Sequence, residues 1–174
     1  MGKEYEKEKE FVQKIAEAYQ LGENKSRASV ITFSNEAKLS IKFNQFYDQA
    51  SFAQAVSEIP FFGGKTKIDK ALSLAESEMF KEVNGARSGV PDTLILLTDG
   101  KSNDDPKVTV KKLRSRGVNI IVLGITKEVN DEMLRKIAGD SKNYFTAENF
   151  DILISKEFIE TLQVKICETG ENLY

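Results

Sequence analysis

Residues 93–100 have the sequence Thr-Leu-Ile-Leu-Leu-Thr-Asp-Gly, in which an apolar, β-branched run is followed at once by a carboxylate and a glycine. A short apolar run bounded by turn residues is typical of a strand buried on both faces, as in a parallel sheet. Asp99 would stand at the carboxyl end of this strand, the edge at which open α/β sheets bind ligands. We therefore expect Asp99, together with a second loop at residues 61–66 that opens a helix, to carry the function of the chain.

Strands and helices alternate along the rest of the chain. Residues 37–43 alternate strictly between apolar and polar, which indicates a strand with one solvent-exposed face. We expect this strand to be antiparallel at the sheet edge, after a hairpin turn at Asn35 and Glu36. The order of elements predicts an α/β fold, a Rossmann-like, doubly wound and mainly parallel sheet with helices on both faces and one antiparallel edge strand. The other expected strands are 28–33, 118–125 and 144–146, and the expected helices are 3–19, 51–59, 67–80, 104–116, 131–138 and 151–166.

Composition excludes several classes of function. The chain of 174 residues has 25 basic and 27 acidic side chains and a formal charge of −2, so no overall field favours nucleic acid or an anionic membrane. It has no histidine, which excludes histidine-dependent catalytic triads and histidine metal sites. No segment approaches the ~20 apolar residues of a membrane span, and the sequence shows no signal peptide. We expect one domain over residues 3–168.

The two ends of the sequence are expected to be engineered. Residues 171–174, Glu-Asn-Leu-Tyr, match the start of a protease-cleavage site used in expression tags, so we leave residues 1–2 and 170–174 out of the expected fold. The single cysteine, Cys167, has two interpretations: a lone thiol near a helix end, or half of a disulfide whose other half is missing.

Five short motifs occur in an order that can be compared with known families. They are Phe62-Gly63-Gly64-Lys65-Thr66, Ile68-Asp69-Lys70-Ala71-Leu72, Leu96-Leu97-Thr98-Asp99-Gly100, Arg116-Gly117-Val118 leading into residues 122–125, and Asn149-Phe150-Asp151. Each motif is weak alone. Together, in this order and spacing, they resemble the von Willebrand factor A domain, the fold of integrin I domains, over nearly the whole chain.

The resemblance implies a divalent cation, usually Mg²⁺, at the carboxyl edge of the sheet. In the family its ligands come from an Asp-x-Ser-x-Ser loop after the first strand, a threonine and an aspartate; Thr66 matches the threonine and Asp99 the aspartate. Hard oxygen ligands suit Mg²⁺. In such domains a carboxylate of a partner protein completes the cation's shell. The resemblance therefore implies an extracellular or secreted adhesion module of matrix type, not an enzyme, with a protein ligand that presents an acidic side chain.

This sequence departs from the family at its start. It contains no Asp-x-Ser-x-Ser, and Gly2-Lys3-Glu4-Tyr5 resembles the beginning of the family's first helix, so the first strand, central in the family's sheet, is missing. Related domains often pair a cysteine near Cys167 with one before that strand, which agrees with the loss. Ser34 and Ser102 lie near the right loops but do not match the family's serine positions. We expect the remaining ligands, Thr66 and Asp99, to hold Mg²⁺ weakly.

Three repairs of the sheet remain open from the sequence. The strands on either side can close up and pair, a second copy can lend an element by exchange, or a segment outside this sequence can supply the strand. Of the first two we favour exchange, because closure must draw packed helices inward by about one strand spacing, ~4.8 Å. The alternative function is therefore a truncated, self-associating form without metal or ligand binding. An enzyme on a similar sheet is disfavoured, because no Gly-x-Gly-x-x-Gly or Walker-type loop follows a strand.

Two local predictions concern helix starts near the expected site. Asp104, Asp105 and Pro106 are expected to begin a helix, with a carboxylate capping its free N–H groups at the positive end of the helix dipole. A second cation site at this acidic pair is the alternative. For Thr66, the alternative to a metal ligand is a capping residue of the helix that follows.

Overall fold

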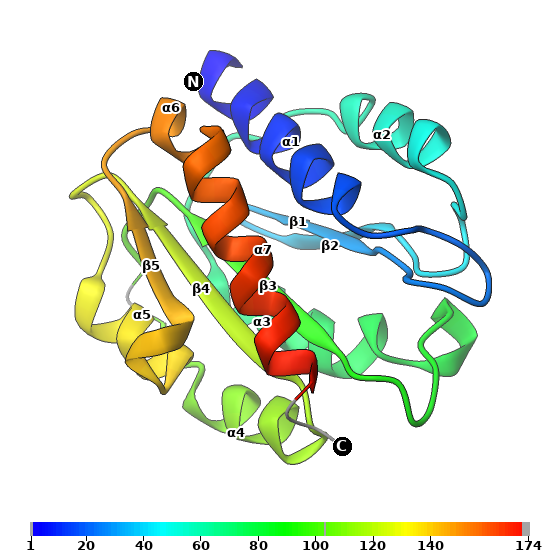
Figure 1. The fold of residues 1–174 in the computed structure, drawn as a ribbon. Coiled ribbons are helices and arrows are strands. Elements are labelled where there is room, and N and C mark those ends of the chain that lie inside the picture. Colours follow the sequence, from blue (N-terminus) through cyan, green and yellow to red (C-terminus); the bar gives the residue numbers. More distant parts are fainter. Residues whose placement is uncertain (1, 103, 172–174) are drawn as a thin grey trace.

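The computed structural model describes residues 2–102 and 104–171, and its strands form two separate sheets (Figure 1). β1 (Val30–Phe33) and β2 (Ala37–Ile41) are antiparallel, as the alternating pattern predicts. β3 (Thr93–Thr98), β4 (Asn119–Ile125) and β5 (Tyr144–Ala147) pair in parallel in the order β3-β4-β5.

Helices follow the strands in the predicted alternation. They are α1 (Gly2–Glu17), α2 (Gln49–Ser57), α3 (Ile68–Leu74) with its wider continuation η1 (Ala75–Met79), α4 (Lys107–Ser115), α5 (Asp131–Ala138), α6 (Phe150–Leu153) and α7 (Lys156–Glu171), with short 3₁₀ turns η2 (Glu82–Asn84) and η3 (Ser141–Asn143). Within the described ranges, no helix is long and apolar enough to cross a membrane. The α/β fold class is thus confirmed.

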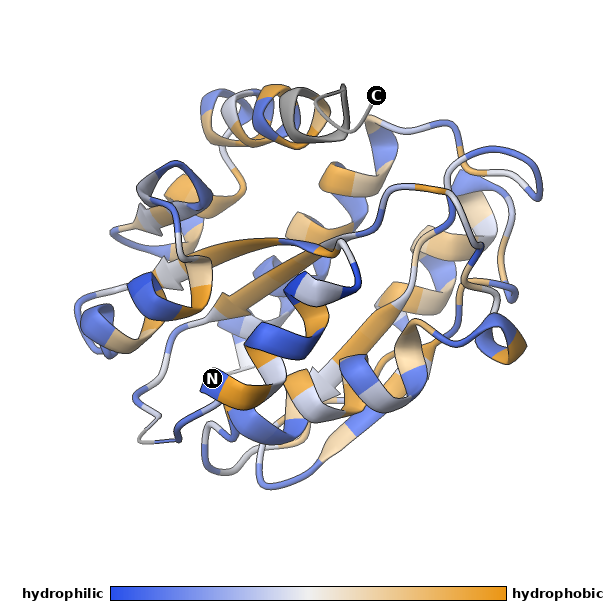
Figure 2. Cartoon of the chain, turned by 90° about the horizontal axis from the view of Figure 1, so that it is seen from below, coloured by the Kyte–Doolittle hydropathy of each residue, from blue (hydrophilic) through white to orange (hydrophobic). Residues whose placement is uncertain are grey.

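Strand β4 is buried on both faces. Ile120 and Val122 pack on one face into a cluster with side chains of α3, α4 and α5, whereas Ile121 and Leu123 pack on the other with α1, α6 and α7. This two-sided burial is the reason for its continuous apolar sequence. Figure 2 shows the consequence: the strands are largely hydrophobic, whereas each helix carries hydrophobic and hydrophilic stripes.

Two expected helix boundaries were wrong. The last helix, expected over 151–166, is two helices separated at Ile154 and Ser155, because each piece has its own cap. Asn149 Oδ1 accepts hydrogen bonds from the first amides of α6, and Ser155 Oγ accepts one from Phe158 N in the first turn of α7. Helix α4 begins at Lys107 rather than at Asp104.

The middle of the sheet is open. β1 pairs only with β2, and β3 pairs only with β4 in the part of the chain that the structure describes. The two strands have therefore not closed on one another. A cavity of about 1410 Å³ lies between them, lined by residues of both strands and of α1, α3 and η1.

Candidate functional site

Thr66 and Asp99 lie together at the carboxyl end of β3. Thr66 Oγ1 packs so closely on the backbone of Gly100 that a Cβ at position 100 would overlap it. The glycine after Asp99 is thus required by the close approach of the loop that carries Thr66. The structure brings together the two residues that the sequence predicts as metal ligands. The N-cap residue of α3 is Lys67 rather than Thr66, and its side chain makes no capping hydrogen bond, so the capping interpretation of Thr66 was wrong.

The loop that carries Thr66 is fixed to the turn after β1. Lys65 N donates to Asn35 Oδ1 (3.0 Å), and Lys67 N donates to Ser34 O (3.1 Å). Gly64 has φ +154°, and a Cβ there would lie 2.8 Å from Asn35 Nδ2, so only glycine fits. The carboxyl ends of β1 and β3 therefore meet the same loop, and the two strands run in the same direction.

Asp104 has a different role from the one predicted. Its carboxylate accepts hydrogen bonds from Ser102 Oγ (2.6 Å) and Asp69 N (3.4 Å). It also forms an ion pair with Lys67 Nζ (3.1 Å). Asp69 lies in the first turn of α3, so Asp104 caps α3 rather than α4. The carboxylate at the start of α4 is that of Asp105, which accepts from Lys107 N (3.3 Å).

Burial and hydrogen bonding act in opposite directions on Asp104. Burial tends to raise the pKa of this carboxyl, but hydrogen bonds from Ser102, Asp69 and Lys67 outweigh it and lower the pKa to about 2. Asp104 is therefore charged at neutral pH and satisfied by protein donors. Among residues 2–102 and 104–171, no group of three His, Cys, Asp or Glu side chains could hold a metal ion. This geometry speaks against a second cation site at the acidic pair.

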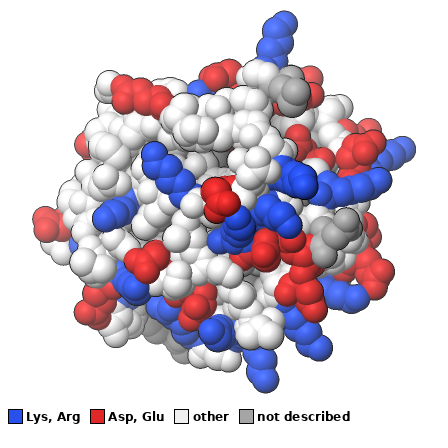
Figure 3. All heavy atoms as spheres, turned by 180° about the vertical axis from the view of Figure 1, so that it is seen from behind, with Lys and Arg blue, Asp and Glu red and all other residues white. Residues whose placement is uncertain are grey.

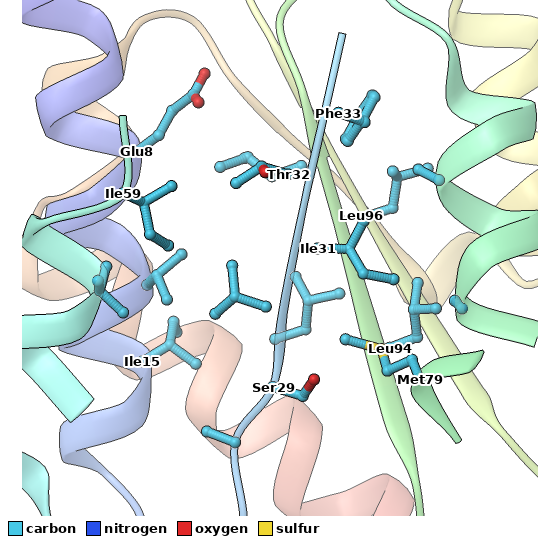
Figure 4. Close-up of a pocket in the computed structure, with 18 of the residues that line it drawn as sticks. Glu8, Ile15, Ser29, Ile31, Thr32, Phe33, Ile59, Met79, Leu94 and Leu96 are labelled. Atoms are coloured by element: carbon cyan, nitrogen blue, oxygen red, sulfur yellow. The ribbon is translucent and has the colours of Figure 1, made fainter. Parts of the chain in front are cut away.

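Glu8 is a residue near the site that sequence reasoning missed. Its side chain lines the cavity at the end near Asp99, and burial, Asp99 and Glu4 raise the pKa of its carboxyl to about 7 (Figure 4). The signal was present, because Glu8 precedes the core residues Val12 and Ile15 by four and seven positions and so shares their face.

Tyr19 lines the cavity and lies beside Cys167. Cys167 is exposed and free, and as the single cysteine it has no intrachain partner. Burial, with Cys167 as the second influence, raises the pKa of the Tyr19 hydroxyl. The two interpretations of Cys167, a lone thiol or half of a disulfide, therefore both stand.

The face of the molecule opposite to that of Figure 1 carries no patch of a single charge sign. Figure 3 shows basic and acidic side chains interspersed over the face opposite to that of Figure 1. This mixed surface agrees with the near-neutral balance of 25 basic and 27 acidic residues. Recognition would therefore depend on local groups at the sheet edge and the cavity rather than on overall charge.

Comparison with known proteins identifies the family. The model of the von Willebrand factor type A domain matches residues 1–160. The chain belongs to this family. A solved structure of proximal thread matrix protein 1 from the mussel byssus, with a zinc-occupied MIDAS motif, superposes with TM-score 0.85 at 25% identity, over 94% of this chain and 44% of that one.

Relatives of this A domain are matrix and adhesion proteins. Human collagen alpha-6(VI) chain is 32% identical over 96% of this chain and 7% of its own length. The transmembrane cell adhesion receptor mua-3 of Caenorhabditis elegans is 29% identical over 80% of this chain and 4% of its own length. The chain spans a third or less of the length of the first four relatives that it matches. It covers 28% of cuticlin-6, 6% of collagen alpha-5(VI), 33% of matrilin-1 and 7% of collagen alpha-6(VI). These relatives support an adhesion module and an extracellular location.

Proposed function

We propose that this A domain is a non-enzymatic adhesion module of extracellular-matrix type. It binds a protein ligand that presents an acidic side chain to the cation site. The observation that carries the proposal is the juxtaposition of Thr66 with Asp99 and Gly100 at the carboxyl edge of β3. The matrix and adhesion relatives support the same class of function. A partner carboxylate would approach a cation at this edge.

The metal site of this chain would be weak. Thr66 and Asp99 supply one hydroxyl and one carboxylate, which are hard oxygen donors of the type that Mg²⁺ accepts. Two donors leave most of the octahedral shell to water, and Mg²⁺ dehydrates reluctantly. When bound, the cation would supply a positive charge and an open coordination position for the partner's carboxylate, while Thr66 and Asp99 would hold it at the sheet edge.

Calorimetry tests the strength of this site. We expect Mg²⁺ titrated into the metal-free chain to bind with a dissociation constant in the millimolar range or weaker. Asp99→Ala is expected to abolish the remaining heat, because it removes the only carboxylate of the pair. Asp105→Ala, which changes an exposed carboxylate at the start of α4, is the matched control and should leave the heat unchanged. Micromolar binding that is lost in Asp99→Ala would contradict a weak site.

Solid-phase binding tests the adhesion function itself. The chain is applied to wells coated with purified fibrillar collagen, fibronectin or laminin, in millimolar MgCl₂ or in EDTA. We expect saturable binding to at least one coating, reduced by EDTA and by Asp99→Ala but not by Asp105→Ala. Binding that is indifferent to both EDTA and Asp99→Ala would remove the cation from the mechanism.

Self-association is the second candidate function, and the open edges of β1 and β3 favour it. A form without metal or ligand binding would exchange an element with a second copy and so fill the gap. It predicts a dimer mass in solution and no cation-dependent binding in either assay above.

A further inference from the structure

We propose that Asp104 is a positioning residue of the cation edge, where its carboxylate holds the loop that carries Thr66 against the loop that carries Asp99. The inference rests on the proposed function, because it concerns the same edge of the sheet, and it names the residue that sets the affinity of that edge for a cation. Asp104 would not touch the cation, because both of its carboxylate oxygens already accept from protein donors. It acts through its contacts with the two loops.

The two ligand loops touch each other, but they are bonded to each other only through Asp104. Thr66 Oγ1 packs on the backbone of Gly100, and no hydrogen bond joins these two residues in the described part of the chain. Within that part, each hydrogen bond or ion pair between residues 61–69 and residues 99–105 ends on the Asp104 carboxylate. This one side chain is therefore the polar link between the loops.

On the Thr66 side, Asp104 contacts both a side chain and the main chain. Lys67 Nζ lies 3.1 Å from Asp104 Oδ1, and Asp69 N donates to Asp104 Oδ2 over 3.4 Å. Lys67 follows Thr66 directly, and Asp69 lies in the first turn of α3. The two contacts therefore restrain the point at which the Thr66 loop enters α3.

On the Asp99 side, Asp104 contacts Ser102. Ser102 Oγ donates to Asp104 Oδ2 over 2.6 Å, and Asp104 N donates to Ser102 Oγ over 3.4 Å. Ser102 is 3% exposed and the Asp104 side chain is 10% exposed, so water competes little for these bonds. Because Ser102 belongs to the turn that follows Asp99, the contact restrains the turn that presents this carboxylate.

Each loop has a second anchor that leads away from the other loop. Lys65 N donates to Asn35 Oδ1 in the turn between β1 and β2 (3.0 Å). Asn130 Nδ2, at the start of α5, donates to Ser102 O (3.3 Å). Without Asp104 the two loops would be bonded to different elements, and packing alone would fix their spacing.

The spacing of the loops matters because a divalent cation tolerates little error in its ligands. Mg²⁺ binds oxygen donors at about 2.1 Å in near-octahedral geometry, so Thr66 and Asp99 can both reach it only at one separation. Groups that orient the ligands from outside typically contribute roughly 10- to 100-fold to metal affinity. Loss of the Asp104 link is therefore expected to weaken cation binding although both ligands remain.

A capping role alone would have a different consequence. As the cap of α3, Asp104 needs only the hydrogen bond from Asp69 N, and its loss would lower the free energy of unfolding without changing the cation affinity of the folded chain. A positioning role needs Ser102 as well. Ser102→Ala removes the bond from Ser102 to the Asp104 carboxylate without changing the charge near the site, so this variant separates the two roles.

Mn²⁺ is the probe, because it accepts the same hard oxygen donors as Mg²⁺ and broadens the NMR signals of nearby amides. At a fixed, subsaturating Mn²⁺ concentration, the broadening of the Thr66 and Gly100 amide signals measures the occupancy of the edge. We expect about 10-fold less broadening in Asp104→Asn and in Ser102→Ala than in the unmodified chain.

Two variants are matched controls for the lost charge and the lost hydroxyl. Asp105→Asn removes an exposed carboxylate next to Asp104, and Ser115→Ala removes an exposed hydroxyl on α4. Both should change the broadening by less than ~2-fold, because exposed charges are screened and a distant hydroxyl does not contact the loops. Circular dichroism establishes that each variant is folded under the conditions of the titration.

A second measurement needs no cation. In the metal-free chain we expect backbone order parameters at Thr66 and Gly100 near the ~0.85 of rigid backbone, lowered in Asp104→Asn and Ser102→Ala but not in Asp105→Asn. If Mn²⁺ does not broaden these amides even in the unmodified chain, the proposed cation edge is wrong. The order parameters then still decide whether Asp104 holds the two loops together.

Three results would overturn the proposal. The first is unchanged order parameters in both Asp104→Asn and Ser102→Ala. The second is an equal loss of broadening in Asp104→Asn and Asp105→Asn, since charge alone would then explain it. The third is lowered stability with unchanged broadening, which would leave Asp104 as a cap of α3 only. If Asp104→Asn does not fold, Ser102→Ala decides alone.

Discussion

Asp104 shows how a single side chain can join two loops at the sheet edge. Its side chain is only 10% exposed, and its partners come from the β3–α4 loop and from the start of α3. Because these hydrogen bonds favour the charged carboxylate, its pKa is lowered to about 2 despite burial. The interaction therefore stabilises the folded chain only where Asp104 is ionised.

Asp104→Asn is expected to lower the free energy of unfolding by about 2 kcal/mol at neutral pH. The folded pKa lies below the unfolded value of 3.8, so this contribution is fully present above about pH 4 and is lost as the pH falls through 2. Urea unfolding of both proteins between pH 2 and pH 7 measures the difference. Asp105→Asn, at an exposed carboxylate, is the control and should change stability by less than ~0.5 kcal/mol. A pH-independent difference would show that Asp104 acts through packing and not through charge.

Sequence predicted the residues with local signatures better than those with distant partners. Thr66 and Asp99 follow from motifs, and the structure places them together. Asp104 was assigned to the nearest helix in sequence, because nothing local indicates that it reaches Asp69, 35 positions away. Glu8 was missed although its helical spacing from Val12 and Ile15 indicates the buried face; only its raised pKa, which depends on burial and on Asp99, has no local signature.

At the scale of elements, hydrophobic pattern predicted the strands and most helices. The continuous apolar runs became β3 and β4, and the alternating run became β2, because burial on two faces or one dictates those patterns. The break at Ile154 was not predicted, because the apolar spacing continues across it. There the capping side chains of Asn149 and Ser155 decide the local structure.

The unpaired edges of β1 and β3 could be predicted only in part. Their apolar, β-branched sequences predict burial, and the family resemblance predicts a missing neighbour between them. The sequence could not distinguish closure, exchange and a strand supplied by a segment outside this sequence, because that choice depends on how the helices on both faces pack. In the structure, a cavity lies between β1 and β3 and their facing edges stay unpaired within the described residues.

At the scale of the whole molecule, the sheet is divided into two parts held by shared helices. One cluster joins side chains of α1, α2 and β2, and another joins α1 to β4, β5, α6 and α7. Helix α1 therefore belongs to both parts and spans the gap (Figure 1). In the part of the chain that the structure describes, the edges of β1 and β3 that face one another at the centre have no strand partner.

Residue-resolved amide hydrogen exchange, with the mass of the chain measured in the same sample, tests the divided sheet most directly. If the gap is open in a monomer, Ile95 and Leu97 N–H exchange rapidly, whereas Leu94 and Leu96 N–H, which bond to β4, are protected. β4 supplies the internal control, because its neighbours occupy both edges. Equal protection of all four β3 amides at the mass of one chain would contradict the account, because β1 and β3 would then have closed on one another.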